Sequence, residues 1–425
     1  MTQPQVQSLD ALIAVQPGAV VSREIVSRSA GTVTAGTVTL SGTGIGASGV
    51  GNAVDTATSN LNATATGGDI YLTNAGNVAA QAAATGGPLI SPGARRSKVR
   101  VAKVYLGIPN AHWPTPAMDL AREMEVYEDA FAQRAAAFGD VEFPVNQLVT
   151  TVEGAQEAAA KLAGMDGVLA IHLSMGVTPM LQKILAAGTP TMLFAAPYSG
   201  HEWTHFGQIM RNPEGALLDC VLTSDLDQLA AAVRPFRAMH HLREAKIVNV
   251  SERESSAEYL QAVRTKFGTE IVRIERDRVL AAYEAVPEAA AKAEARQWIA
   301  NAEKVVEPST EEIENSCRLA LAFERLLQEE DATTITVDCY GTMYRKLPAF
   351  PCIGFTRLND MGFAGICESD LKSAMTFILM QSLSGNPGFI SDPTLDESKP
   401  GIILAHCLGS TKMHGPALTR PACGR

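Results

Sequence analysis

The sequence predicts an α/β protein with two doubly wound, parallel-sheet (Rossmann-like) domains after a low-complexity N-terminal segment. From about residue 98, short apolar runs of strand length alternate with segments of helical periodicity. This alternation implies right-handed crossovers and parallel sheets that are covered on both faces. Near the C-terminus, three apolar runs lead directly into an acid or a histidine. Because parallel α/β sheets bind ligands beyond the carboxyl ends of their strands, these residues predict a site.

Residues 1–97 are predicted to be the low-complexity segment, rich in Gly, Ala, Thr, Ser and Val. They contain no Cys and no His, and Tyr71 is their only aromatic residue. The tetrapeptide GTVT occurs at 31–34 and again at 36–39. Alternating Thr and Val suits short strands, and the segment resembles the strand repeats of filamentous-haemagglutinin-type adhesins. The composition favours a disordered or weakly structured tail, because its apolar surface is too small to offset the entropy of ordering and so few repeats cannot stack into a stable solenoid.

The first α/β domain is predicted over residues 98–243. Apolar runs bounded by turns predict strands at Val99–Ile108, Gly167–Leu173, Pro190–Ala196 and Ala216–Leu222. Helical periodicity predicts helices at Met118–Ala137, Glu153–Ala163 and Leu226–His240. Pro235 lacks a backbone N–H and is expected to kink or split the last of these helices.

The second α/β domain is predicted over residues 244–425. Its expected elements are strands Lys246–Val250 and Glu270–Ile274, helix Ala257–Phe267 and a helical stretch over 276–329. Three further buried strands are expected at 335–337, 364–367 and 401–405, running into Asp338, Glu368 and His406 respectively. A helix at Leu371–Leu383 follows the second of these and is stopped by the turn at 385–388.

Composition excludes several classes of function. A net charge of -10 over 425 residues argues against nucleic-acid or anionic-membrane partners, which need clustered Lys and Arg. No apolar run is long enough for a transmembrane helix. Seven scattered cysteines without a CxxC pair argue against a disulfide framework or a structural zinc site. The N-terminus is a poor signal peptide, so a cytoplasmic location is expected. Homo-oligomerisation is left open.

Four residues at the predicted strand ends have the chemistry of a metal site. Asp338, Glu368, Asp370 and His406 supply the carboxylate oxygens and imidazole that Mn²⁺ or Mg²⁺ accepts. We therefore expect a divalent cation, with a free carboxylate available to transfer a proton. The alternative is that Asp338 and Asp370 are helix N-caps and His406 is a turn residue.

The segment from Cys367-Glu368-Ser369-Asp370 to Ser391-Asp392-Pro393 resembles the L-fucose isomerase and L-arabinose isomerase superfamily. There, a strand ending in Glu-x-Asp leads into a helix, a Gly-containing turn and a short strand that carries an Asp. The resemblance is clear over about 330–414 and only architectural over 98–330. It implies a Mn²⁺-dependent aldose–ketose isomerase working through an enediol, with Glu368 or Asp370 as metal ligand or proton-transferring carboxylate. Asp338 is assigned from its position alone.

The sequence departs from this family after residue 414. Family members continue into a further, largely β domain that supplies another metal-binding histidine and walls the sugar pocket. Here only eleven residues follow His414. We therefore expect a truncated or fused relative in which His406 or His414 substitutes for that ligand, or in which the site is incomplete.

A second cluster, Pro197–His205, follows the predicted strand Pro190–Ala196. His201 and Trp203 suit a sugar-binding loop, because an aromatic face stacks on the ring and polar groups bond its hydroxyls. The HEWTH letters also match the HExxH zinc-protease pattern, but that motif needs a well-formed helix and a third ligand. His112 and Trp113 follow the first strand and are also predicted to bind substrate; the alternative is a turn with a buried Trp.

The leading functional hypothesis is a sugar isomerase-like protein that binds a small carbohydrate and a divalent metal. Glu368 and Asp370 would be the catalytic core. One alternative is a non-catalytic carbohydrate-binding relative, and another is a glycoside hydrolase that uses paired carboxylates on the same scaffold. Cys339, Cys367 and Cys407 flank the predicted site and are either soft metal ligands or small buried hydrophobic residues.

Overall fold

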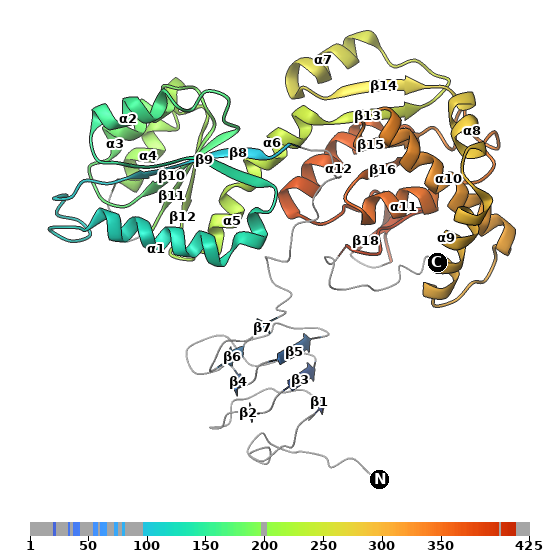
Figure 1. The fold of residues 1–425 in the computed structure, drawn as a ribbon, viewed down its shortest axis with the longest axis horizontal. Helices are drawn as coiled ribbons and strands as arrows, with labels where there is room; N and C mark the ends of the chain where they lie inside the picture. Colours follow the sequence, from blue (N-terminus) through green and yellow to red (C-terminus); the bar gives the residue numbers. More distant parts are fainter. Residues whose placement is uncertain are drawn as a thin grey trace. The chain divides into compact units, whose positions relative to one another are not determined.

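The computed structural model describes residues 97–196, 202–398 and 401–413, and the backbone of seven short strands between residues 20 and 80. The chain divides into two compact units, Met1–Thr85 and Gly86–Arg425. Both are drawn in Figure 1. The boundaries predicted at 97/98 and 243/244 stay predictions.

The first unit contains strands that pair only in parallel. They are β1 (Val20–Ser22), β2 (Val33–Thr34), β3 (Thr37–Gly42), β4 (Val54–Ala57), β5 (Asn60–Ala65), β6 (Leu72–Asn74) and β7 (Ala79–Ala80). One sheet has the order β1-β3-β5-β7 and the other β2-β4-β6. Successive strands thus alternate between two sheets, with one GTVT repeat entering β2 and the next β3. These short strands agree with the weakly β form of the predicted segment. The adhesin resemblance stays a prediction.

A five-stranded parallel sheet, ordered β12-β11-β10-β8-β9, opens the second unit. Its strands are β8 (Val99–Leu106), β9 (Val141–Val149), β10 (Gly167–His172), β11 (Thr191–Ala195) and β12 (Leu218–Leu222). Helices α1 (Leu120–Gln133), α5 (Gln228–Ala232) and α6 (Arg234–Glu244) pack on one face, and α2 (Val152–Ala159), α3 (Thr178–Leu185) and α4 (Trp203–Ile209) on the other. Pro235 lies in the first turn of α6, so the predicted split of that helix is confirmed.

A four-stranded parallel sheet, ordered β14-β13-β15-β16, follows. Its strands are β13 (Lys246–Val250), β14 (Glu270–Ile274), β15 (Thr334–Val337) and β16 (Ala364–Cys367). One face packs on α8 (Arg276–Glu284), α10 (Thr310–Glu329) and α11 (Cys352–Asp360), the other on α7 (Ala257–Phe267) and α12 (Leu371–Ser384). Helix α9 (Glu288–Asn301) packs on α10, which begins with a Ser309–Glu312 capping box. The two doubly wound parallel sheets confirm the predicted fold class.

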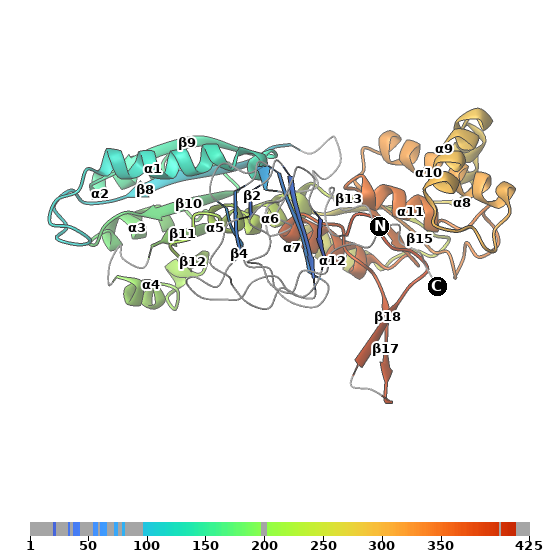
Figure 2. The same ribbon diagram turned by 90° about the horizontal axis from the view of Figure 1, so that it is seen from below.

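One predicted strand does not join the parallel sheet. β18 (Gly401–Ala405) pairs antiparallel with β17 (Asp392–Asp396), and this hairpin extends away from the adjoining helices in Figure 2. All five residues of β18 are exposed, so the prediction of a third buried parallel strand was wrong. Its Ile-Ile-Leu run has the composition of a buried strand, which periodicity alone does not distinguish from an exposed ribbon.

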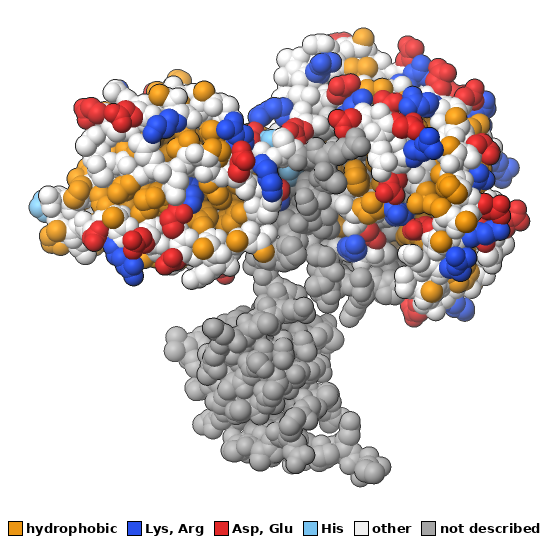
Figure 3. Space-filling model, viewed as in Figure 1, with side chains coloured by type: hydrophobic (Ala, Val, Ile, Leu, Met, Phe, Trp, Pro, Cys, Tyr) orange, Lys and Arg blue, Asp and Glu red, His pale blue; other side chains and the backbone are white. Residues whose placement is uncertain are grey.

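Charged side chains of both signs are interspersed over the described surface drawn in Figure 3. That face carries no continuous basic patch among the described residues. Within the described part of the chain, no helix has the length and apolar character needed to cross a membrane. The absence of a nucleic-acid partner and the cytoplasmic location stay predictions, and homo-oligomerisation stays open.

The close contact of α6 with β10 gives a first test of the packing. Gly167 faces Phe236, and a Cβ atom at this glycine would lie 2.2 Å from the ring. We expect Gly167→Ala to lower the free energy of unfolding by about 2 kcal/mol through overpacking, measured by urea denaturation. Gly207→Ala in α4 is the control, since its Cβ would meet nothing within 4 Å. Equal destabilisation of both variants would contradict this packing.

Candidate metal and sugar site

Glu368 lies in a left-handed turn at the carboxyl end of β16. Glu368 and Ser369 have φ angles of 65° and 57°, which are uncommon for residues other than glycine. The Ser369 backbone N–H donates to the Val337 carbonyl at 3.1 Å, and the Ser369 hydroxyl donates to the Asn249 side chain. These bonds to two neighbouring strands hold the turn. Cys367 therefore stays buried while Glu368 is exposed at the sheet edge, where backbone strain of this kind often marks a functional site.

The β17–β18 hairpin brings two more donors to Glu368. Asp392 is paired with Ala405 in the hairpin. His406, the next residue after Ala405, therefore lies close to Asp392. His406 Nε2 lies 4.0 Å from Asp392 Oδ2, and one donor atom from each of Glu368, Asp392 and His406 lies within 4.8 Å of the others. A cavity of about 280 Å³ is lined by these three residues with Tyr340 and Cys407. The sequence therefore predicted two members, Glu368 and His406, of a group that the structure brings together.

This donor set fits a hard divalent cation. Two carboxylates and one imidazole are ligands that Mn²⁺ and Mg²⁺ accept, and an open cavity leaves room for water or substrate oxygens. Asp392 was not predicted as a ligand, although it is the acid on the short strand of the motif described above. Its role depends on the hairpin pairing, which the local sequence does not reveal.

Asp370 is the N-cap of α12. Its carboxylate accepts hydrogen bonds from the backbone N–H groups of Lys372 and Ser373, both at 3.0 Å, and from the Ser373 hydroxyl at 2.6 Å. Burial raises the pKa of Asp370, but these hydrogen bonds outweigh it and lower the pKa. The structure thus gives Asp370 the capping role that was the alternative to metal binding. Its assignment as a ligand or catalytic residue stays a prediction.

The cap can be tested by two substitutions. Asp370→Ala is expected to lower the free energy of unfolding by about 1 kcal/mol, because two N–H groups of the first turn of α12 lose their acceptor. Asp370→Asn keeps an acceptor oxygen and is expected to restore most of that stability. Thermal or urea denaturation of both variants checks this. An equal loss of stability in Asp370→Ala and Asp370→Asn would show that the negative charge of Asp370, and not its capping hydrogen bonds, stabilises the helix.

Asp338 is buried at the end of β15 and is also engaged by neighbouring donors. Its carboxylate accepts from the Thr342 N–H at 2.9 Å, the Thr342 hydroxyl at 2.8 Å and the Ser251 hydroxyl at 3.2 Å. Burial raises the pKa of Asp338, and these bonds lower it below its usual value. Asp338 therefore stabilises the turn after β15 and lies outside the Glu368–Asp392–His406 group. Its role as a metal ligand stays a prediction.

An exposed aromatic cluster, which the sequence analysis missed, lies beside this group. Tyr340 is 63% exposed and stacks on Tyr344 with ring centroids 5.9 Å apart, and Phe350 lies next to both. A larger cavity of about 500 Å³, lined in part by Arg345 and Phe350, adjoins the same loop. An exposed aromatic face beside carboxylates is the arrangement that sugar sites use. The sequence did contain an indication of this cluster, because Tyr340 follows closely after the strand-end acid Asp338 and Cys339.

Four substrate-binding residues were predicted in loops that follow strands of the first parallel sheet, and the structure describes only some of them. His201 and the Trp203 side chain lie outside the described residues. His112 and Trp113 lie in the loop after β8, and Trp113 is 39% exposed, so the alternative of a buried Trp is wrong. Their binding of substrate stays a prediction.

Glu202 has a structural role that argues against the zinc-protease pattern. It is buried and accepts hydrogen bonds from the Val177 N–H at 3.1 Å and the Thr178 hydroxyl at 2.9 Å. His172 Nε2 lies 3.0 Å from its Oε2. The carboxylate that would be the general base of an HExxH motif is therefore occupied in binding α3 and β10.

A part of this chain is similar in sequence to known sugar isomerases. No protein-family model matches the chain. Over 91 residues it is 29% identical to a sulfoquinovose isomerase from Clostridium sp. (strain MSTE9), covering 21% of this chain and 20% of that protein. Over 97 residues it is 21% identical to a sulfoquinovose isomerase from Alkalicoccus urumqiensis, covering 22% of each. The matched segment thus spans about a fifth of these relatives. The similarity agrees with a sugar isomerase-like protein, while membership of the L-fucose and L-arabinose isomerase superfamily stays a prediction.

Proposed function

We propose that this chain is a sugar isomerase-like protein that binds a divalent cation, Mn²⁺ or Mg²⁺, through Glu368, Asp392 and His406. The observation that carries the proposal is the convergence of these donors within 4.8 Å of one another, in a cavity of about 280 Å³. Partial similarity to two sulfoquinovose isomerases supports the reaction class.

The proposed reaction moves a proton between adjacent carbons of an aldose through an enediol. A bound cation would supply Lewis-acid polarisation of the carbonyl and orient the neighbouring hydroxyl. Glu368 is exposed at the cavity and would remove the proton from one carbon and return it to the next. Tyr340, which lines the same cavity, would stack on the apolar face of the sugar.

An exchange experiment tests this function. The purified chain with Mn²⁺ is incubated with sulfoquinovose, glucose or fucose in D₂O and followed by NMR. We expect ketose formation with exchange of the C2 proton, abolished by chelation and by Glu368→Gln. Glu397→Gln, which removes an exposed charge between β17 and β18, is the control and should retain activity.

Two outcomes would favour the alternatives. Carbohydrate binding without exchange on any of the three sugars would indicate a non-catalytic relative. Metal-independent cleavage of aryl glycosides would indicate a hydrolase, a function for which paired carboxylates are also suited.

A further inference from the structure

Cys367 and Cys407 meet beside His406, and two further cysteines lie next to them, although the sequence separates all four widely. Cys339 follows β15, Cys352 begins α11, Cys367 ends β16 and Cys407 follows β18. Cys339 and Cys367 are buried, and the His406 side chain is only 4% exposed. The ends of four separate elements therefore direct sulfur atoms into one small region.

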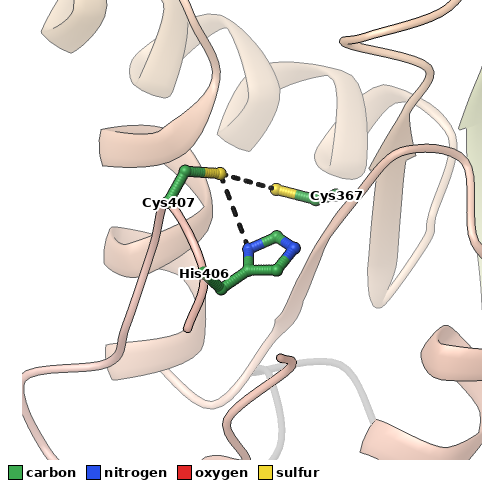
Figure 4. Close-up of side chains that lie close together, drawn as sticks. All are labelled: Cys367, His406 and Cys407. Carbon is green, nitrogen blue, oxygen red and sulfur yellow. Dashed lines mark hydrogen bonds between the residues drawn. The ribbon is translucent and has the colours of Figure 1, made fainter. Parts of the chain in front are cut away.

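The distances in this region suit tetrahedral coordination. The Sγ atoms of Cys367 and Cys407 lie 3.6 Å apart, and Cys407 Sγ lies 3.5 Å from His406 Nδ1. Dashed lines mark these two contacts in Figure 4. The three donor atoms all lie within 4.8 Å of one another. A tetrahedral Zn²⁺ with ordinary Zn–S and Zn–N bonds separates two sulfurs by roughly 3.8 Å and a sulfur from a nitrogen by roughly 3.6 Å.

The other two cysteines adjoin this group of three. The Cys339 thiol interacts with Cys367, and the Cys352 thiol interacts with Cys407. Both lie outside the group whose donor atoms are all within 4.8 Å of one another, so either would have to move to occupy a fourth position.

We propose that Cys367, Cys407 and His406 Nδ1 form a Zn²⁺ site whose fourth position is taken by water or by the nearby thiol of Cys339 or Cys352. Thiolate and imidazole donors in a tetrahedral set select Zn²⁺ over the oxygen-preferring Mn²⁺ and Mg²⁺. The thiolates are separate from the Glu368–Asp392 carboxylates, but both sites use the His406 ring. A neutral imidazole binds a metal through one nitrogen and keeps its proton on the other, so Zn²⁺ on Nδ1 leaves an Nε2–H that faces Asp392 and competes with Mn²⁺ for this ring.

This site has a structural consequence for the exposed hairpin. Cys407 and His406 follow β18, whereas Cys367 belongs to the parallel sheet. A bound ion would therefore fasten the end of the hairpin to β16 and hold the imidazole in one orientation. The absence of a CxxC pair, from which the sequence argued against structural zinc, does not exclude ligands that come from separate elements.

Cobalt binding to the full chain tests the proposal. The reduced protein is freed of metal with a chelator and titrated with Co²⁺, whose thiolate charge-transfer absorption reports sulfur ligation. We expect one such site, displaced by Zn²⁺, with affinity reduced by about 100-fold or more in Cys367→Ser and Cys407→Ser. Cys317→Ser, in α10, is the control and should bind like wild type. Cys339→Ser and Cys352→Ser identify the fourth ligand by which of them weakens binding.

Two further measurements do not rely on cysteine variants that could misfold, or on the isomerase proposal. X-ray absorption at the zinc edge of the wild-type protein should show at least two Zn–S bonds. Glu368→Gln should retain this site even where it loses Mn²⁺. The proposal is overturned by cobalt binding without thiolate charge transfer, by unchanged affinity in both central cysteine variants, or by a Cys367–Cys407 disulfide whose reduction yields no Zn²⁺ affinity.

Discussion

Replacing Glu368 with Gln is expected to lower the affinity of the chain for Mn²⁺ by at least about 100-fold. The substitution removes one of the two carboxylates that lie with His406. Mutating a residue that only supports a metal ligand already lowers metal affinity by about 10- to 100-fold, so losing a ligand should lower it at least as much. Isothermal titration calorimetry of wild type and variant measures the change. Asp392→Asn should behave in the same way, because its carboxylate belongs to the same group.

Asp370→Asn is the matched control for this prediction. It removes the same charge two residues away from Glu368, and its acceptor oxygen still caps α12. We expect unchanged Mn²⁺ affinity in this variant. A loss as large as that of Glu368→Gln would return Asp370 to the ligand set, and unchanged affinity in Glu368→Gln would remove Glu368 from it.

Glu202→Gln is expected to lower the free energy of unfolding by about 3 kcal/mol at neutral pH. Burial raises the pKa of Glu202, but hydrogen bonds from His172, Thr178 and the Val177 N–H outweigh it and lower the pKa from 4.5 to about 2. A carboxyl whose folded-state pKa is lowered stabilises the fold above its unfolded-state pKa. That contribution is lost as pH falls from about 4.5 towards 2.

Urea denaturation across this acid range measures the effect. The difference between wild type and Glu202→Gln should be constant near neutral pH and shrink as pH falls. Glu214→Gln, an exposed acid in the turn after α4, is the control and should change stability by less than about 0.5 kcal/mol. A difference that does not change with pH, or equals that of Glu214→Gln, would show that the ionised carboxylate does not stabilise this region.

Periodicity predicted much of the fold because several strands are buried and largely apolar. Strands β10 and β11 are fully buried and β8 is buried except at Arg100, and the sequence located each of them. Strand β9 was missed because it is an edge strand whose polar residues and Pro144 break the apolar run. Strand β18 was recognised as a strand, but its antiparallel partner and its exposure depend on a hairpin contact.

The site was only partly predictable for a related reason. Glu368 and His406 were found because each directly follows an apolar run, whereas Asp392 joins them through its pairing with Ala405. The four clustered cysteines share no sequence spacing, since their proximity results from tertiary folding alone. Residue chemistry identified the candidates, and long-range pairing decided which of them meet.

Crystals of the full chain grown with Mn²⁺ give the most direct test of the proposed metal site. Anomalous diffraction at the manganese edge locates the ion without reference to any assumed ligand. We predict a peak in the cavity lined by Tyr340 and Cys407, bound by Glu368, Asp392 and His406 Nε2. A manganese peak held by Asp338 or Asp370 instead, or no peak near Glu368 at saturating Mn²⁺, would contradict this assignment.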